Sequence, residues 1–184
     1  LIIDERFTGF GRTGRAFACE TPGVSPDLLL MGNGMGSGLP GGSVAGREDI
    51  LSPLPPTPHR LHPMTATACT SALRYAMDND LWSQAKRVEH WFEAYRGQLE
   101  DHVLVRRFQG VGAMYGIEVG APAGTLSQSL ANEVRAATLA QGLLMWECGT
   151  DAVVVGLIPP LMVSGNDVDD ACNMIVAALD TIAV

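Results

Sequence analysis

Short runs of adjacent apolar residues, separated by glycine-rich loops, mark the first part of the chain. The runs Leu1–Asp4 and Asp27–Met31 have the pattern of strands buried in a parallel sheet. Ser43–Gly46 predicts a third short strand. Because proline removes backbone donors and restrains the residue before it, Ser52–His62 predicts an extended connector. Small residues at helical spacing then predict a tightly packed helix over Thr65–Met77.

The second part of the chain alternates helices with strands. A long amphipathic helix is expected from Leu81 to Leu99, capped by Asp80, because large apolar residues recur near the helical period. After it, the pattern predicts strands at Val103–Phe108, Ala113–Val119, Leu143–Glu147 and Ala152–Leu157, and helices at Ser127–Ala140 and Asp167–Ile182. Strands that alternate with helices indicate an α/β fold, with a boundary around residues 100 to 103.

The composition is typical of a soluble globular protein, since 47% of the 184 residues are hydrophobic and 17% are charged. A formal net charge of −8 argues against nucleic acid as a partner, because phosphate backbones are bound by clustered Lys and Arg. No apolar run approaches the roughly 18 residues of a spanning helix, so we expect no membrane segment. The chain opens directly on the apolar strand at Leu1, and we therefore expect a fragment or one product of a split gene.

Cysteine and lysine usage limits the available chemistry. The four cysteines have neither a CxxC spacing nor neighbouring histidines, so we expect no metal site and predict reduced thiols in a cytoplasmic protein. Lys86 is the only lysine, and it lies in a polar stretch of the long predicted helix. Arginine cannot replace an amine nucleophile because its guanidinium stays protonated. Lys86 is therefore the one side chain that could act as an amine nucleophile, and its polar helical surroundings do not indicate a catalytic site.

The run Asp4–Gly14 carries a resemblance to a known family. Its sequence, Asp-Glu-Arg-Phe-Thr-Gly-Phe-Gly-Arg-Thr-Gly, is similar to a segment of the class III (ornithine/4-aminobutyrate-type) pyridoxal-phosphate-dependent aminotransferases. In that family the segment begins Asp-Glu-Val and ends Gly-Phe-Gly-Arg-Thr-Gly. Further motifs follow in family order at Phe17–Glu20, Pro26–Asp27, Gly34–Pro40, Gly46–Glu48, Ala68–Cys69, Ala72–Leu73, Gly116–Glu118 and Pro159–Leu161. The resemblance covers the whole chain but only the second half of a family member.

The resemblance implies an α/β fold like that of the fold-type I pyridoxal-phosphate transferases. Residues 1–102 would form the second part of the large, cofactor-binding domain together with the interdomain helix, and residues 103–184 the C-terminal small α/β domain. Family members dimerise with sites at the interface. We therefore expect a homodimer or a hetero-oligomer, including one in which another chain supplies the N-terminal half.

The resemblance also assigns roles to single positions, and most of these carry the wrong residue. Asp4 matches the aspartate that pairs with the protonated pyridine nitrogen of the cofactor. Asn33 matches the lysine that forms the Schiff base, and an amide neither forms an imine nor transfers a proton. Arg6 and Phe7 stand where the family has an apolar residue on the ring face and a polar contact near the ring oxygen.

Two further positions agree with this loss. Leu61 matches the threonine that reaches the cofactor phosphate across the dimer, and Gly156 matches the arginine that often grips a substrate carboxylate. We therefore predict a chain that has lost transamination and acts as a degenerate or partner-dependent subunit. Pyridoxal phosphate is then bound noncovalently or not at all.

Two alternatives stay open. In the first, the former cofactor cavity is repurposed for acid/base work on a small molecule, with Asp4, Arg6, Asn33 and His62 as candidate groups and His59 beside them. In the second, a split aminotransferase binds pyridoxal phosphate together with a partner chain. The candidate groups also have structural interpretations, in which Asp4 caps the loop after its strand and His62 belongs to a solvated loop.

Overall fold

The computed structural model describes residues 1–55, 61–121 and 124–183. The chain divides into two compact units, which we call unit 1 (Leu1–Ala85) and unit 2 (Lys86–Val184). The division lies inside helix α3 (Leu81–Glu93). The boundary expected between residues 102 and 103 refers to the domains of the family and stays a prediction.

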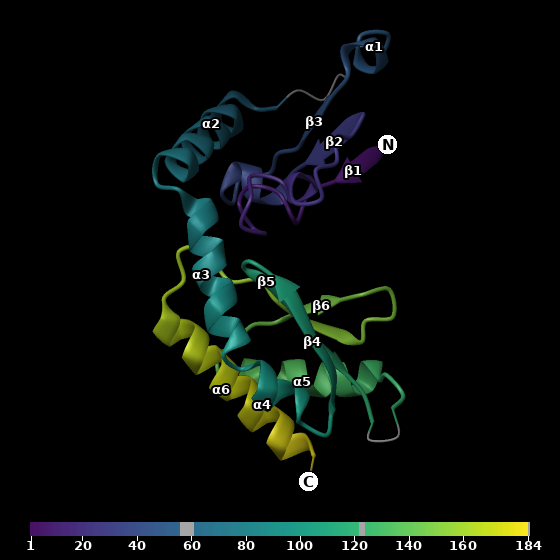
Figure 1. The fold of residues 1–184 in the computed structure, drawn as a ribbon, viewed down its shortest axis with the longest axis vertical. Helices are drawn as coiled ribbons and strands as arrows, with labels where there is room; N and C mark the ends of the chain where they lie inside the picture. The colour runs from purple at the N-terminus through teal and green to yellow at the C-terminus, as the bar shows by residue number, and fades with distance from the viewer. Residues whose placement is uncertain (56–60, 122–123, 184) are drawn as a thin grey trace. The chain divides into compact units, whose positions relative to one another are not determined.

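Unit 1 contains a sheet of three short strands in the order β1-β2-β3 (Figure 1). Strands β1 (Ile2–Asp4) and β2 (Leu28–Met31) are parallel, as the apolar runs predict. Strand β3 (Ser43–Gly46) pairs with β2 in the antiparallel direction, with Val44 opposite Leu30. The loops around the strands carry two 3-10 turns, η1 (Ala18–Glu20) and η2 (Asn33–Gly36).

Two helices complete unit 1. The short helix α1 (Glu48–Leu51) directly follows β3, and the longer α2 spans Pro63–Asp78. Proline is well suited to the first position of α2, because the amide that it lacks has no partner inside a helix. Thr65 and Cys69, four residues apart on α2, are buried beside the glycine loop, so α2 covers this loop.

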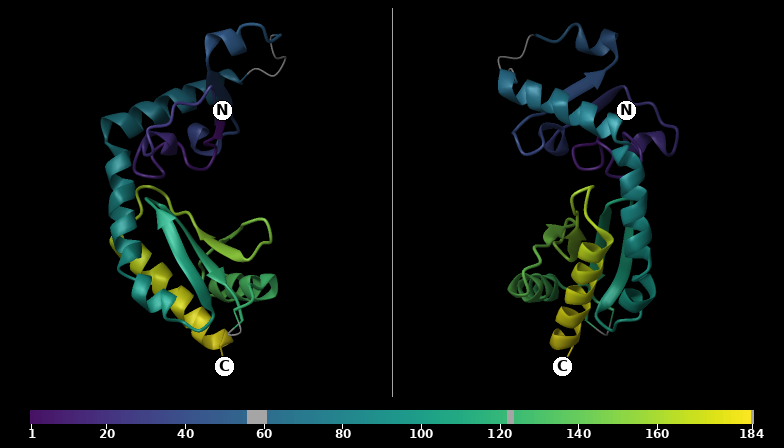
Figure 2. Two further views of the ribbon diagram at one scale, coloured as in Figure 1. Left: turned by 45° about the vertical axis from the view of Figure 1, so that its right-hand side comes forward. Right: turned by 90° about the vertical axis from the view of Figure 1, so that its left-hand side faces the viewer.

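Unit 2 is built on an antiparallel sheet of four strands in the order β4-β5-β7-β6. The strands are β4 (Val105–Val111), β5 (Met114–Val119), β6 (Trp146–Cys148) and β7 (Val154–Leu157). The helices are α4 (Arg96–Glu100), α5 (Gln128–Ala140) and α6 (Gly165–Ile182), together with the second part of α3. Figure 2 shows α5 lying along the sheet with α6 beside it.

The core of unit 2 follows from the alternation of side chains along the strands. Tyr115, Ile117 and Val119 of β5 are buried, whereas Met114, Gly116 and Glu118 between them face the less covered side. Val155 of β7 lies opposite Ile117 and is also buried. Helix α6 buries a row of apolar residues at helical spacing, Val168, Cys172, Ile175, Ala178 and Leu179.

The structure corrects the sequence-based elements at two places. The single helix expected from Leu81 to Leu99 is two helices, because the amide of Tyr95 bonds the carbonyl of Phe92 and tightens the turn between α3 and α4. The strand expected at Leu143–Glu147 is observed at Trp146–Cys148, after a turn at Gly142 with φ of 95°. The other expected helices and strands are present, with ends that differ by a few residues, and the connector expected at Ser52–His62 lies partly outside the described residues.

Candidate functional site

Asp4, the last residue of β1, is held by the side chain of Arg6. Arg6 Nε lies 2.9 Å from Asp4 Oδ1, and Arg6 Nη2 lies 2.7 Å from Oδ2. The backbone N–H of Arg6 also donates to Asp4 Oδ1 at 3.0 Å. These hydrogen bonds lower the pKa of Asp4 and raise the pKa of Arg6. Asp4 therefore stays ionised, and its charge is already paired within the chain.

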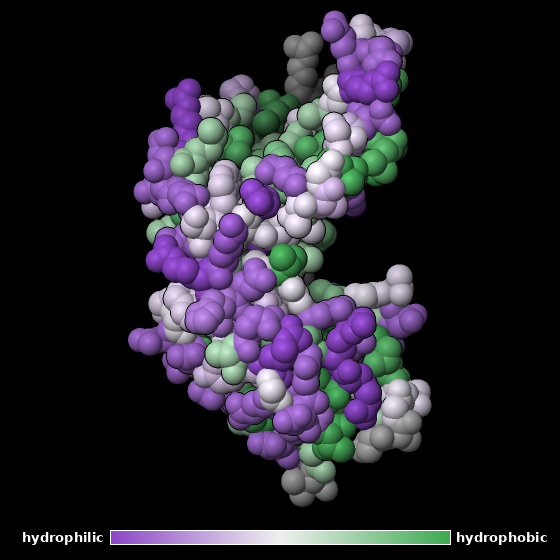
Figure 3. Space-filling view, in the orientation of Figure 1, coloured by the Kyte–Doolittle hydropathy of each residue, from purple (hydrophilic) through white to green (hydrophobic). Residues whose placement is uncertain are grey.

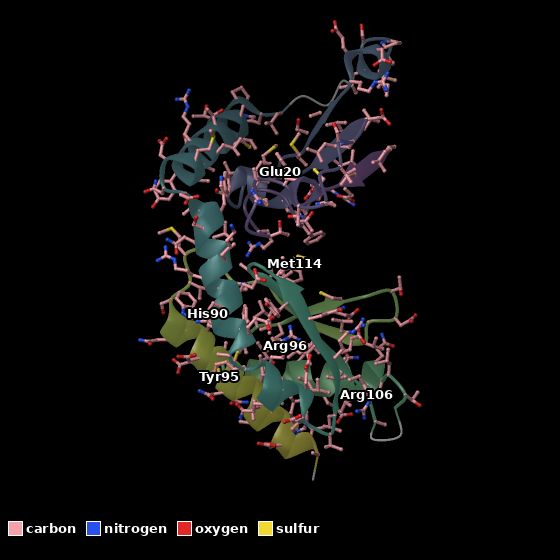
Figure 4. The ribbon with its side chains drawn as sticks, viewed as in Figure 1. Glu20, His90, Tyr95, Arg96, Arg106 and Met114 are labelled. Atoms are coloured by element: carbon pink, nitrogen blue, oxygen red, sulfur yellow. The ribbon has the colours of Figure 1, made fainter. Side chains whose placement is uncertain are left out.

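Glu5, next to this pair, is a buried carboxylate with 1% of its surface exposed. It accepts hydrogen bonds from the hydroxyl of Thr8 and from the backbone N–H groups of Ala18, at 3.0 Å, and Cys19, at 2.8 Å. Burial opposes the charge of Glu5, but these hydrogen bonds outweigh it, so the pKa of Glu5 is lowered. Figure 4 labels Glu20 at the end of the same loop, where its carboxylate accepts the N–H of Phe17. Glu5 thus fixes the loop that follows the Asp4–Arg6 pair.

Asn33 begins η2 directly after β2 and is exposed. Its φ of 46° lies in the left-handed region, which asparagine adopts at lower cost than most other residues with a side chain. The preceding Gly32 lies against Arg6, because a Cβ built on Gly32 would be 3.4 Å from Arg6 Cγ. The structure therefore brings together Asp4, Arg6 and Gly32, the residue before Asn33.

Leu61 lies against the other end of the glycine loop. A Cβ built on Gly41 would be 3.1 Å from Leu61 Cδ1 and 3.0 Å from Thr65 Cγ2, so this close approach requires glycine at position 41. Leu61 makes an apolar contact where the resemblance expects the hydroxyl of a threonine.

His62 and Phe7 lie apart from these contacts. His62 is the N-cap of α2, and its Nδ1 accepts the N–H of Met64 at 3.2 Å. Among the described residues, no hydrogen bond or ion pair joins His62 to Asp4 or Arg6, and Phe7 is 61% exposed. The catalytic role of His62 stays a prediction, and His59 lies outside the described residues.

Gly156 lies in unit 2, on β7, opposite Gly116 of β5. A Cβ built on Gly156 would be only 2.5 Å from Cys148 Sγ, so the thiol occupies the space that a larger residue at position 156 would need. A hollow of about 380 Å³ on this side of the sheet is lined by Gln109, Met114 and Cys148 together with other uncharged residues. The described lining therefore offers no cationic side chain to a substrate carboxylate.

The residues at the positions that the resemblance assigns to pyridoxal phosphate do not fit a covalently bound cofactor. Asn33 has no amine, and the carboxylate of Asp4 is engaged by the guanidinium of Arg6 rather than open to a pyridinium nitrogen. Arg6 itself stands at the position expected to lay an apolar side chain on the ring.

Sequence reasoning missed two of these features. The contact of Arg6 with Asp4 was detectable in principle, since oppositely charged residues two apart at a strand end lie on the same side. The burial of Glu5 was not, because its donors Ala18 and Cys19 come from a loop whose path the pattern does not give.

Two general features of the described residues bear on function. No group of three or more His, Cys, Asp or Glu side chains in the described part of the chain is arranged to hold a metal ion. Likewise, within the described ranges no helix is both long and apolar enough to cross a membrane.

Comparison with known proteins gives a consistent match. Residues 1–179 match the model of the family Aminotransferase class-III. The chain is 32% identical to ornithine aminotransferase of Bacillus cereus over 97% of its own length and 44% of that protein. It is 31% identical to acetylornithine aminotransferase of Bacillus subtilis, over 97% of the chain and 45% of that protein.

A solved structure extends the match to the fold. The ornithine aminotransferase of Toxoplasma gondii, whose structure is described as having partial occupancy of PLP at the active site, has a TM-score of 0.83 and 28% identity. The match covers 100% of this chain and 43% of that one. The chain thus spans less than half the length of the relatives that it matches.

Proposed function

Because the chain belongs to the class III aminotransferase family, we propose that it is a member that does not transaminate and acts as a degenerate or partner-dependent subunit. Its fold is that of the pyridoxal-phosphate-dependent aminotransferases, as the solved relatives show. The reduced state of its described cysteines is compatible with the cytoplasm, where we place the protein.

The pairing of Asp4 with Arg6 carries the proposal. In the family, the matching aspartate keeps a pyridinium nitrogen protonated and so makes the ring an electron acceptor. Here a guanidinium forms several hydrogen bonds with both carboxylate oxygens. A cofactor nitrogen would have to displace the guanidinium of Arg6 from Asp4. The ion pair that it formed with Asp4 would therefore replace the existing pair of Arg6 and Asp4.

Asn33 supports the same conclusion from a different kind of chemistry. The side-chain amide is neither a nucleophile nor a base near neutral pH, so it supplies neither the imine nor the proton transfer that transamination needs. Lys86, the only lysine, lies on α3 at the start of unit 2, whereas Asp4 and Asn33 belong to unit 1. The chain therefore lacks an amine at the position of the Schiff-base lysine, and the carboxylate of Asp4 is already engaged by Arg6.

The repurposed-enzyme alternative gains less support from the contacts. Its histidine, His62, already accepts a backbone hydrogen bond as a helix cap. Its carboxylate, Asp4, is tied to Arg6 and kept ionised. Neither group is placed as a free acid or base, so we favour the non-transaminating subunit.

A pair of variants tests the proposal through the visible absorption of bound pyridoxal phosphate. Wild type and Asn33→Lys should both give no band beyond free cofactor, because Arg6 still engages Asp4. The double variant Asn33→Lys with Arg6→Val supplies the amine and frees Asp4, and it should give a band. A saturable band in the wild type would refute the proposal, and a band in Asn33→Lys alone would refute the role of Arg6.

A further inference from the structure

His102 lies in the turn between α4 and β4, and each of its two ring nitrogens faces a different partner. Its Nδ1 accepts the backbone N–H of Leu104 at 3.2 Å. Its Nε2 lies 3.4 Å from Oδ1 of Asp180, which belongs to the last turn of α6. The histidine side chain is nearly buried, with 11% of its surface exposed, whereas that of Asp180 is 67% exposed. His102 therefore connects the residues that lead into the sheet of unit 2 with the end of its last helix.

These two contacts favour different protonation states of the same ring. A backbone N–H only donates, so Nδ1 can accept it only while that nitrogen carries no proton. The neutral ring then has its proton on Nε2, and at 3.4 Å this group is too far from the carboxylate for a strong hydrogen bond. When a proton from solvent binds Nδ1, the nitrogen becomes a second donor that faces the N–H of Leu104. The ring then also carries the charge that attracts Asp180.

The other charged groups near this turn leave Asp180 as the partner of the charged ring. Three such side chains lie on the elements that meet here, namely Glu100, Asp101 and Arg106. Glu100 binds Arg96 at 2.6 Å, and Asp101 is exposed. Nη2 of Arg106 donates to the carbonyl of Val103. Among the described residues, Asp180 is the carboxylate within ion-pair distance of His102. Hydrophilic residues predominate over α4 and α6 on the face of unit 2 in Figure 3, so water surrounds this junction.

A second histidine makes the same backbone contact in a different setting. Nδ1 of His62 accepts the N–H of Met64, which is also two residues ahead and also 3.2 Å away. His62 is exposed, however, and no ion pair joins it to a carboxylate in the described part of the chain. The two histidines thus share the contact that a proton breaks, but only His102 has a partner for the charge that the proton brings.

We propose that His102 is a pH-sensitive switch that exchanges a hydrogen bond before β4 for an ion pair at the end of α6. At neutral pH the uncharged ring holds the N–H of Leu104. Below about pH 6.5, where histidine side chains ordinarily gain their proton, the ring releases Leu104 and holds Asp180, because exposed carboxylates stay ionised there.

The two contacts depend on pH with opposite signs. The hydrogen bond from Leu104 is present above the titration of His102 and is lost as the pH falls through it. The ion pair with Asp180 is present below the titration and is lost as the pH rises through it. The switch therefore moves local order from one end of the junction to the other and changes the overall stability little. It lies within unit 2, so it stands or falls independently of the proposed function.

Nuclear magnetic resonance of the full chain between about pH 5 and 8 tests the switch. Ring nitrogen shifts report the tautomer and protonation of His102, and amide exchange reports the two ends of the junction. After correction for the intrinsic pH dependence of exchange, protection at Leu104 should fall by roughly two- to tenfold on protonation. Protection in the last turn of α6 should rise by about twofold. A neutral ring with its proton on Nδ1, or constant protection at Leu104, would overturn the proposal.

Two conservative variants separate the contacts. Asp180→Asn keeps the shape of the side chain and removes its charge, so the Leu104 response should move to lower pH and the gain in α6 should disappear. His102→Asn keeps an oxygen that can accept the N–H of Leu104 but does not titrate, so both pH responses should disappear. The amide of Met64, which reports His62, should behave identically in wild type and both variants.

Three results from the variants would contradict the switch. They are a Leu104 response that Asp180→Asn leaves in place, an α6 response that persists in His102→Asn, and a shift at Met64 as large as that at Leu104. Unchanged amide shifts in β5 and β7 check that each variant folds. If a variant fails this check, the opposite pH responses of Leu104 and α6 in the wild type still decide, and responses of the same sign overturn the proposal.

Discussion

The two units of this chain bury their apolar residues to different extents. In unit 2, the sheet is covered by helices, and Phe108, Ile117 and Val155 of three different strands are fully buried. In unit 1, the apolar residues of β1 and β2 are half-buried or exposed, and Ile2 and Leu1 are among the most exposed hydrophobic residues. Unit 2 has the features of a self-sufficient fold, whereas unit 1 has those of one layer of a larger fold.

Charged groups show the same difference. In unit 2, Arg96 binds Glu93 and the carbonyl of Phe108, while the hydroxyl of Tyr115 donates to Glu93 at 2.6 Å (Figure 4). This network ties the helices to the sheet. In unit 1, Asp4 pairs with Arg6, which is only two residues away, and Asp27 pairs with Arg47, and neither of these ion pairs involves a helix longer than one turn. The positions that the resemblance assigns to the cofactor therefore lie mostly in the less complete unit.

The largest expected effect comes from making the same substitution in the two units. Ile117 is fully buried and Ile2 is 62% exposed. Ile117→Ala should lower the free energy of unfolding by about 2–5 kcal/mol, through lost burial and a cavity. Ile2→Ala should change it by less than about 0.5 kcal/mol in the isolated chain. Urea denaturation measures both, and a cost for Ile2→Ala as large as that for Ile117→Ala would break the comparison.

The next largest effect concerns the best-anchored group of unit 1. Glu5→Gln weakens the charge-assisted hydrogen bonds from Thr8, Ala18 and Cys19, and we expect a local destabilisation of about 1–3 kcal/mol at neutral pH. Faster amide exchange at Ala18 and Cys19 measures it. An unchanged exchange rate in the variant would show that Glu5 does not hold the loop.

The same carboxylate predicts a pH dependence with a definite sign. Because the folded-state pKa of Glu5 is lowered from its ordinary 4.5, its contribution is present above pH 4.5 and is lost as the pH falls through the folded pKa. The advantage of wild type over Glu5→Gln should therefore shrink below about pH 4.5. A constant difference across that range would contradict the assignment.

The smallest effect is expected at Asn33. Lysine at its φ of 46° should cost about 1 kcal/mol, whereas Asn33→Gly should be neutral or slightly stabilising, because glycine adopts the left-handed region freely. Thermal unfolding of the two variants measures the difference. If Asn33→Lys is as stable as Asn33→Gly, the backbone at this position does not disfavour the family lysine.

Local patterns predicted most of the elements but not the contacts between distant residues. The strands at Ile2–Asp4, Leu28–Met31 and Ser43–Gly46 follow from their apolar runs. The break between α3 and α4 was missed because the apolar residues keep their helical spacing across the turn in which the N–H of Tyr95 donates to the carbonyl of Phe92. Helical periodicity within the segment carries no information about that turn.

At the candidate site, the sequence predicted which residue types are present but not the contacts that their side chains make. The change from lysine to asparagine is visible in the glycine loop, given the family pattern, and it remains a prediction about ancestry. The engagement of Asp4 by Arg6 and the use of His62 as a helix cap required coordinates, because both depend on side-chain direction at the end of an element.

The central claim is that this chain has the class III fold without the amine that the chemistry needs. Borohydride reduction in the presence of pyridoxal phosphate, followed by intact mass measurement, tests it most directly, because Lys86 is the only lysine. We predict that wild type and Lys86→Arg each keep the mass of their own unmodified sequence, with no stoichiometric pyridoxyl group on either. A saturable adduct of one group per chain in the wild type, absent from Lys86→Arg, would contradict the account.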